Sequence, residues 1–247
     1  MKRMNDCFID LTITSPPYDN LREYNGFDFD FEKIAKELYR VTKDGGVVVW
    51  IVGDATINGS ETGTSFKQAL YFKEIGFNLH DTMIYQKNSP PLTHKRYEQN
   101  FEYMFILCKG KIKTFNPIYR KKIYKDTRTK TQNRREKNGE FSIGFRSKNK
   151  ETIKGNVWKY SVGGGISSND KISFLHPAIF PEQLVKEHIY SWSNEGNLIY
   201  DCFMGSGTTA KMAHLQKRNW IGSEISKEYT ELANKRIKKY INQTTLF

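Results

Sequence analysis

The chain has 247 residues, enough to bury one substantial hydrophobic core, and 38% of them are hydrophobic. Its hydrophobic runs are too short for a membrane-spanning helix, and its N-terminus lacks the apolar stretch of a signal peptide. The three cysteines, Cys7, Cys108 and Cys202, show no metal-binding spacing and cannot all pair. These features predict a reduced, cytoplasmic protein with no metal site and no membrane contact.

The first predicted element is a short buried strand over residues 9–13, followed by Ser15-Pro16-Pro17-Tyr18. Two successive prolines end the strand and form a stiff turn, because proline cannot donate to a sheet ladder. The Ser15 hydroxyl and the Pro16 carbonyl could accept N–H bonds from an amino group on a planar ring, and Tyr18 could stack on that ring. Taken alone, the same residues could be no more than a turn between a strand and a loop.

Helical and strand patterns then alternate along the chain. Apolar residues on one face predict a helix over 31–41, which residues 43–46 end. A β-branched and aromatic run predicts a strand over 47–52 that is buried on both faces. We further expect a helix over 66–75, an antiparallel pair of strands over 79–86 and 101–107, and a closing helix over 228–240.

Almost all of the surplus charge lies in the middle of the chain. Residues 109–160 contain 17 Lys or Arg and 4 Asp or Glu, a local net charge of +13, whereas the whole chain carries +12. Basic side chains contact phosphates, and Arg, Asn and Gln can read base edges. This segment is therefore predicted to bind nucleic acid, although a charge run of this kind can also be a solvated loop. The candidate contacts are Arg120, Lys121, Lys122, Arg128, Arg134, Arg135 and Arg146.

A second chemical motif lies near the C-terminus. A strand beginning at Leu198 ends at Asp201, and a turn with Gly205 and Gly207 leads into a helix, after which a further strand ends near Glu224. This layout binds nucleosides, with glycines beneath the ligand and a carboxylate on the ribose. One short Gly-x-Gly without a P-loop lysine favours a nucleoside that carries no phosphates. Asp201 could instead cap the following turn, and Glu224 could belong to the N-cap region of the last helix.

Together, the segments 14–18 and 201–208 resemble the amino-group DNA methyltransferases that use S-adenosylmethionine. The catalytic motif precedes the cofactor motif, which is similar to the beta-class permutation. The segment His176-Pro177-Ala178-Ile179-Phe180-Pro181 is a third match, and it could also be a helix-entry turn. The resemblance implies a catalytic turn of Ser15, Pro16, Pro17 and Tyr18. It implies a cofactor site formed by His176, Pro177, Phe180, Asp201, Phe203, Gly205, Ser206, Gly207, Thr208 and Glu224.

The expected fold class is α/β, with a doubly wound and mainly parallel sheet, as in a permuted Rossmann-like methyltransferase fold. We expect one methyltransferase domain over 1–247, in which the basic DNA-recognition lobe over 109–160 is the inserted target-recognition region. The implied partner is double-stranded DNA, with a cognate restriction endonuclease as a candidate and monomer and homodimer both open. The resemblance also implies a prokaryotic or phage-encoded protein.

The expected reaction moves a methyl group from S-adenosylmethionine to the exocyclic amino group of a flipped base. None of the cysteines follows a proline, so the nucleophile of ring-carbon cytosine methylation is missing. Serine at the first motif position favours N4-cytosine, with N6-adenine as the alternative. Only residues 1–8 precede the catalytic strand, where the family usually carries part of the adenine pocket, so an inactive DNA-binding protein is a further alternative. Protein-glutamine and RNA methyltransferases carry a similar turn, but the motif order and the basic insert count against them.

Overall fold

The computed structural model describes residues 1–17, 29–88, 95, 97–122, 132–144, 150–163 and 165–244. The chain forms two compact units, of which the first combines Met1–Asn116 with Asn156–Phe247 and the second is Pro117–Gly155. The predicted insertion over 109–160 thus contains the whole second unit. Its two ends, residues 109–116 and 156–160, belong to the first unit.

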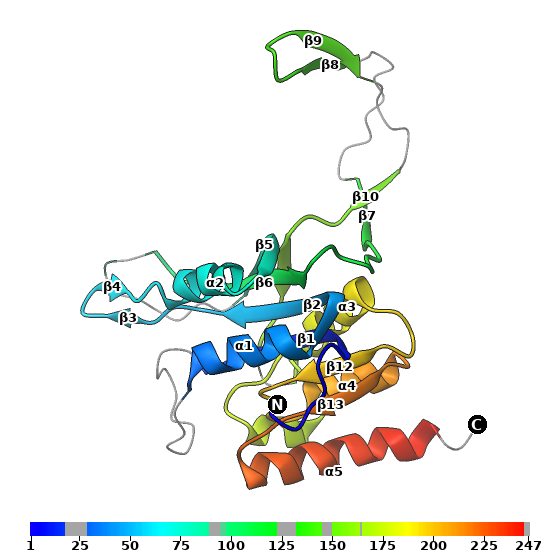
Figure 1. The fold of residues 1–247 in the computed structure, drawn as a ribbon. Helices are drawn as coiled ribbons and strands as arrows, with labels where there is room; N and C mark the ends of the chain where they lie inside the picture. The colour runs from blue at the N-terminus through cyan, green and yellow to red at the C-terminus, as the bar shows by residue number, and fades with distance from the viewer. Residues whose placement is uncertain are drawn as a thin grey trace. The chain divides into compact units, whose positions relative to one another are not determined.

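The first unit is built on a seven-stranded sheet with the order β11-β5-β6-β2-β1-β12-β13 (Figure 1). The strands are β1 (Ile9–Thr14), β2 (Thr42–Val52), β5 (Phe77–Lys87), β6 (Phe101–Lys109), β11 (Val157–Tyr160), β12 (Leu198–Asp201) and β13 (Asn219–Gly222). Strand β6 runs antiparallel to both β2 and β5, and the other four pairings are parallel. The sheet is therefore mainly parallel, and its order reverses between β1 and β12, as in a Rossmann-like fold.

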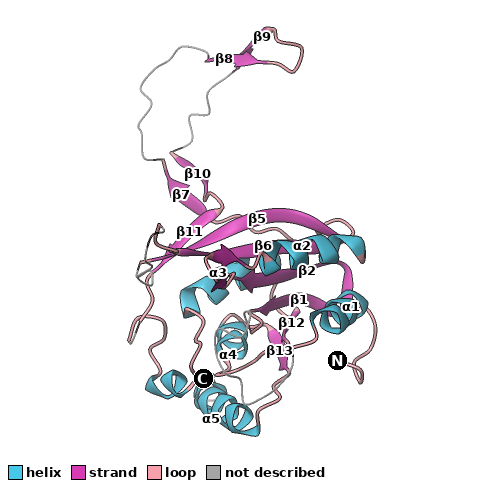
Figure 2. Ribbon diagram, turned by 90° about the vertical axis from the view of Figure 1, so that its left-hand side faces the viewer, coloured by secondary structure: helices cyan, strands magenta, loops and turns pink. Residues whose placement is uncertain are grey.

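Helices cover both faces of this sheet (Figure 2). They are α1 (Phe31–Val41), α2 (Thr64–Glu74), α3 (Glu182–Trp192), α4 (Thr208–Leu215) and α5 (Lys227–Thr244), with a 3₁₀ helix, η1, over Lys171–Leu175. Helices α1 and α2 pack on one face, while α4 and α5 share a smaller apolar cluster with β13 on the other side. A short hairpin of β3 (Thr56–Ile57) and β4 (Ser60–Glu61) precedes α2.

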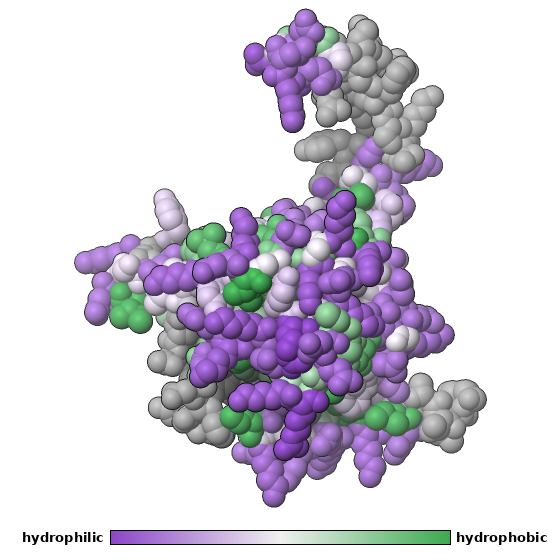
Figure 3. Space-filling view, in the orientation of Figure 1, coloured by the Kyte–Doolittle hydropathy of each residue, from purple (hydrophilic) through white to green (hydrophobic). Residues whose placement is uncertain are grey.

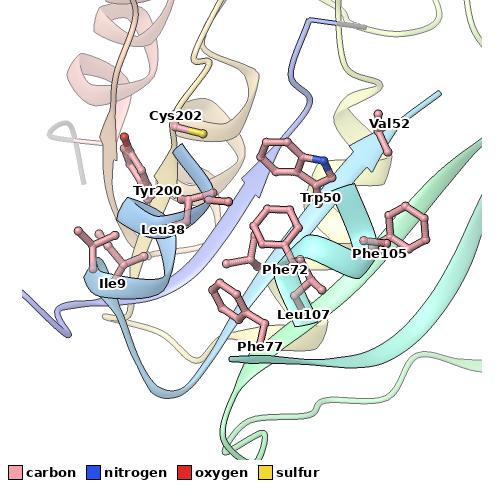
Figure 4. Packing of buried hydrophobic residues seen from close by; sticks show 14 residues of the cluster. Ile9, Leu38, Trp50, Val52, Phe72, Phe77, Phe105, Leu107, Tyr200 and Cys202 are labelled. Carbon is pink, nitrogen blue, oxygen red and sulfur yellow. The ribbon is translucent and has the colours of Figure 1, made fainter. Parts of the chain in front are cut away.

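The largest apolar cluster lies between the sheet and helices α1 and α2. Trp50 of β2 lies at its centre, where its ring meets Phe72 of α2 with 5.1 Å between the centroids (Figure 4). The alternate residues of β2, such as Val49 and Ile51, are equally buried on the opposite face. Strand β2 is therefore buried on both faces, which confirms the prediction from its β-branched run.

Most predicted elements are confirmed, with longer strands than expected. Helix α1 has the predicted bounds, and the Asp30 carboxylate caps it by accepting from the Lys33 N–H at 3.1 Å. Residues 43–46, predicted only to end this helix, lie inside β2, where Gly45 adopts a φ of 81°. A Cβ at Gly45 would lie 2.4 Å from Cγ of Lys113, so this position requires glycine.

The second unit contains two small antiparallel sheets. Strand β7 (Tyr119–Lys121) pairs with β10 (Glu151–Ile153), and β8 (Gln132–Arg135) pairs with β9 (Phe141–Gly144).

Figure 3 shows a largely hydrophilic face on which hydrophobic side chains form only small separate patches. None of the helices in the described part of the chain combines the length and apolarity that a membrane span requires.

Candidate active site

The candidate site lies where the carboxyl ends of β1 and β12 meet. These two strands are parallel neighbours at the point where the strand order reverses, which is where open α/β sheets bind ligands. The Thr14 hydroxyl donates to Oδ1 of Asp201 at 2.7 Å, although the two residues are 187 positions apart. This bond joins the residue before Ser15, Pro16 and Pro17 to the last residue of β12, from which the glycine turn begins; Ser15 and Pro17 are half-buried and Pro16 is buried. Tyr18, predicted to complete the catalytic turn, lies outside the described residues.

Asp201 is the polar centre of this junction and is 1% exposed. Besides the bond from Thr14, its carboxylate accepts from the Thr209 hydroxyl at 2.6 Å and from the Phe203 N–H at 3.0 Å. Burial raises the pKa of Asp201 to about 6, although these three hydrogen bonds act in the opposite direction. The carboxylate therefore ties β1 to β12 and to the start of α4, and its bond to Phe203 is the turn-capping contact that the sequence left open.

The glycine turn is closely packed against the His176 segment. Gly205 and Gly207 have φ values of 48° and 78°, a region that favours glycine. A Cβ at Gly205 would lie 2.9 Å from Nε2 of His176, and one at Gly207 would lie 3.1 Å from Cβ of Ala233. The structure thus brings the predicted His176 segment to the turn, which is 29 positions farther along the chain.

The His176 ring is held from two sides. Its Nδ1 atom lies 2.7 Å from the Ala178 carbonyl oxygen, and its centroid lies 4.4 Å from that of Tyr229 in α5. Pro177 is exposed and Phe180 is half-buried in the same segment, between η1 and α3. The segment therefore serves as the predicted helix entry and also lies beside the glycine turn.

Glu224 lies at the same edge, two residues after β13. Its Oε2 accepts from the Gly205 N–H at 2.8 Å, and its Oε1 accepts from the Ser226 N–H at 3.0 Å. Each carboxylate oxygen retains a further lone pair, so the group can still accept hydroxyls from a ribose. The Ser226 hydroxyl, which accepts from the Tyr229 N–H, caps α5. A half-buried carboxylate beside a glycine turn fits the nucleoside part of S-adenosylmethionine.

Three other predicted cofactor residues make contacts within the protein. The Phe203 ring packs against Phe29, with 5.5 Å between centroids, and joins the cluster below α1 and α2. The hydroxyls of Ser206 and Thr208 accept from the Arg236 guanidinium at 3.2 and 3.0 Å. Phe203 thus attaches the turn to the cluster with α1 and α2, whereas Ser206 and Thr208 attach it to α5.

Sequence reasoning missed the buried charges beneath this turn. Arg236 and Lys211 form ion pairs with Asp170 and Glu182 at 2.7–2.9 Å. One signal was available, because Arg236 occupies an apolar face of the closing helix beside Ala233 and Ile237, both of which are buried. A cation at such a position needs buried partners.

The predicted DNA contacts lie in the second unit. Arg120 and Lys121 are exposed on β7, Lys122 follows them, and Arg135 is exposed on β8. Arg134 pairs with Ser142 across the β8–β9 hairpin, while Arg128 and Arg146 lie outside the described residues. Arg120, Lys121, Lys122 and Arg135 therefore present basic side chains to solvent.

Known proteins are similar in sequence to this chain over nearly its whole length. A family model described as DNA methylase matches residues 9–235. The orphan methyltransferase M.BamHII of Bacillus amyloliquefaciens is 57% identical over 246 residues, which is 97% of this chain and 92% of that protein. The type II methyltransferase M.BglII of Bacillus subtilis is 25% identical over 238 residues, which is 92% of this chain and 63% of that protein.

Solved structures show the same fold. The PvuII DNA methyltransferase, titled cytosine-N4-specific, matches with a TM-score of 0.69 at 20% identity, over 95% of this chain and 81% of that one. The protein TTHA0409 of Thermus thermophilus, solved with S-adenosyl-L-methionine, matches with a TM-score of 0.64 at 22% identity, over 96% of this chain and 88% of that one.

The family model covers most of the chain, M.BamHII is similar over almost all of it, and the solved structures share its fold. The chain belongs to the DNA methylase family, the S-adenosylmethionine-dependent amino-methyltransferases of the restriction-modification type.

Proposed function

We propose that this enzyme methylates the exocyclic amino group of a flipped base in double-stranded DNA, and that the base is cytosine, modified at N4. The observation that carries this proposal is the Thr14–Asp201 hydrogen bond, which joins the end of the catalytic strand to the cofactor strand. N6-adenine is the second candidate, because both amino groups present the same two hydrogens to Ser15 and Pro16.

The catalytic turn would hold and orient the target nitrogen. The Ser15 hydroxyl and the Pro16 carbonyl accept its two hydrogens, which draws the lone pair out of conjugation with the ring, and Tyr18 stacks on the base. S-adenosylmethionine supplies a methyl group already activated by its sulfonium charge. Holding the nitrogen in line with that methyl group then provides much of the rate acceleration.

The cofactor site would be formed by the residues that the structure gathers at the glycine turn. Gly205 and Gly207 allow the ligand to approach the backbone closely, and Glu224 accepts the ribose hydroxyls. His176 closes the methionine side, where its ring is already fixed by Ala178 and Tyr229. Each of these assignments can be tested separately by cofactor binding.

The basic second unit would recognise the DNA target. Its exposed Arg120, Lys121 and Arg135 support phosphate contact, and arginine can also read guanine in the major groove. We propose a cytoplasmic enzyme of prokaryotic or phage origin, with a cognate restriction endonuclease as a candidate partner. Monomer and homodimer are the candidate assembly states.

The decisive experiment is transfer of labelled methyl groups from S-adenosylmethionine to unmethylated DNA, followed by nucleoside digestion and mass spectrometry. N4-methylcytosine would support the proposal. N6-methyladenine would support amino-group methylation but refute cytosine as the target base. 5-Methylcytosine would refute the role of the catalytic turn. Cofactor and DNA binding without any methylated product would favour the inactive DNA-binding alternative.

A further inference from the structure

A fully buried arginine lies directly beneath the glycine turn. The Arg236 side chain, on α5, is 0% exposed. Its Nη1 atom donates to the Ser206 carbonyl oxygen at 3.0 Å, to the Ser206 hydroxyl at 3.2 Å and to the Thr208 hydroxyl at 3.0 Å. One guanidinium nitrogen therefore holds the two residues that flank Gly207.

The other nitrogens of Arg236 hold a different segment. Nε donates to Oδ2 of Asp170 at 2.9 Å, and Nη2 donates to Oε1 of Glu182 at 2.7 Å and to the Ser168 hydroxyl at 3.0 Å. Asp170 directly precedes η1, and Glu182 is the first residue of α3. These anchors therefore lie at the two ends of the segment that carries His176, Pro177 and Phe180.

Neighbouring polar groups complete this arrangement. Lys211 of α4 bonds to Asp170 at 2.8 Å and to Glu182 at 2.7 Å, and the Tyr240 hydroxyl donates to Oδ1 of Asp170 at 2.6 Å. Burial raises the pKa of Asp170, but the hydrogen bonds from Lys211, Tyr240 and Arg236 outweigh it and hold that pKa well below its usual range. The Asp170 carboxylate thus stays charged and paired. The Arg236 cluster comprises Ser168, Asp170, Glu182, Ser206, Thr208, Lys211, Arg236 and Tyr240.

We propose that Arg236 is a positioning residue for the cofactor site: its guanidinium fixes the Gly205–Gly207 turn and, through Asp170 and Glu182, the His176 segment in one arrangement. The inference rests on the proposed assignment of these two segments to the cofactor site. A guanidinium suits this task because its planar fork bonds several groups in fixed directions, which a lysine ammonium cannot reproduce. Supporting groups of this kind keep binding residues in their productive geometry.

If Arg236 contributed only to stability, its replacement would have a different effect. A Lys211 variant distinguishes this role from the positioning role. Lys211 contacts the same two carboxylates, and in the described part of the chain no hydrogen bond joins its Nζ atom to Ser206 or Thr208. Buried ion pairs by themselves are weak evidence for stability. If the cluster only stabilised the fold, replacement of either cation would lower stability without a selective effect on cofactor affinity.

The test compares wild type with Arg236→Lys, Lys211→Met and His188→Leu by calorimetric titration with S-adenosylmethionine. His188 is a matched control, since it is a buried, hydrogen-bonded side chain on α3 that contacts Met104 and Trp192. If Arg236→Lys leaves about a tenth of the molecules with a competent turn, the apparent Kd rises about tenfold. We expect Lys211→Met to raise the Kd by less than about threefold and His188→Leu to leave it unchanged.

Steady-state kinetics and thermal unfolding provide independent readouts. For Arg236→Lys we expect the KM for S-adenosylmethionine to rise with its Kd, while kcat at saturating cofactor stays within about threefold of wild type. The increase in Tm on adding S-adenosylmethionine should shrink in Arg236→Lys and persist in His188→Leu. If Arg236→Lys does not fold, Thr208→Val is tested in its place. The Thr208 variant removes one acceptor of Arg236 on the turn and leaves Arg236 paired with Asp170 and Glu182.

Several results would overturn the inference. A folded Arg236→Lys, or in its place Thr208→Val, with the wild-type Kd would show that the turn does not depend on this guanidinium. Equal losses of affinity in all the variants would indicate a general loss of stability. Failure of the wild type itself to bind S-adenosylmethionine would instead refute the proposed cofactor site, so the two failures are distinguishable.

Discussion

Two threonines on one face of β1 should respond in opposite ways to the same substitution. Thr12 and Thr14 are both 0% exposed and lie two residues apart, so their side chains point to the same side of the sheet. The Thr14 hydroxyl donates to Asp201. In the described part of the chain, the Thr12 hydroxyl is the buried side-chain group without a hydrogen-bond partner.

The surroundings of Thr12 are apolar. It pairs in register with Val48 of β2 and Tyr200 of β12, and both belong to the cluster between the sheet and helices α1 and α2. An unsatisfied buried hydroxyl costs about 1–3 kcal/mol of desolvation free energy. Thr12→Val replaces it with a methyl group of similar size, so we expect the free energy of unfolding to rise by about 1 kcal/mol.

Thr14→Val removes a donor from a buried carboxylate instead. We expect it to lower the free energy of unfolding by about 1–3 kcal/mol, because Asp201 loses one of its bonds while remaining buried. Urea titrations of wild type and both variants in one buffer would measure the midpoints and m-values. For a chain of this size, a change of 1 kcal/mol corresponds to a Tm shift of about 2–4 °C.

Thr12→Val and Thr14→Val are the same substitution on the same face of the same strand, so they differ only in whether a hydrogen bond is lost. Equal destabilisation by Thr12→Val and Thr14→Val would refute the reasoning. Such a result would mean that the Thr12 hydroxyl has a partner, such as a buried water molecule, that offsets its desolvation.

Other predictions concern the site and the second unit. Ser15→Ala should lower kcat for methyl transfer by about 10- to 100-fold with little change in Tm, measured by labelled methyl incorporation, because it removes one hydrogen bond to the reacting amino group. Charge reversal at Arg134 and Arg135 should weaken DNA binding and reduce the slope of log K against log salt by about 2. The pKa of Asp201 is raised to about 6 in the folded protein. Between about pH 4 and 6, its carboxyl is therefore protonated in the folded protein and ionised in the unfolded chain. Wild type should therefore lose stability relative to Asp201→Asn, by up to about 3 kcal/mol, as the pH rises through this window.

A contrary outcome can be stated for each of these three variants. A wild-type kcat for methyl transfer in Ser15→Ala would show that the Ser15 hydroxyl does not contribute to catalysis. An unchanged salt slope would place Arg134 and Arg135 outside the DNA interface, and charge reversal at Lys33 and Lys36, on α1 of the other unit, provides the comparison. A stability difference between wild type and Asp201→Asn that is constant from pH 4 to 6 would show that Asp201 does not titrate there.

Local features of this protein were readable from the sequence. The run Val47–Val52 predicts a buried strand because β-branched residues suit a pleated surface and no polar residue interrupts it. Helix α1 was predicted with its observed bounds because its apolar stripe is a local signal. The Ser-Pro-Pro turn and the glycine turn are likewise set by backbone restrictions of single residues.

Tertiary structure alone decided which distant residues meet. The Thr14–Asp201 bond depends on the parallel register of β1 and β12, and a shift of one residue would turn Thr14 to the other face. Arg236, Asp170 and Glu182 come from three segments, and although the apolar face around Arg236 indicates that it is buried, only the packing of α5 shows that its partners are Asp170 and Glu182. Sequence patterns report on each residue's neighbours along the chain, whereas the desolvation and pairing of a charge depend on groups brought together only by the complete fold.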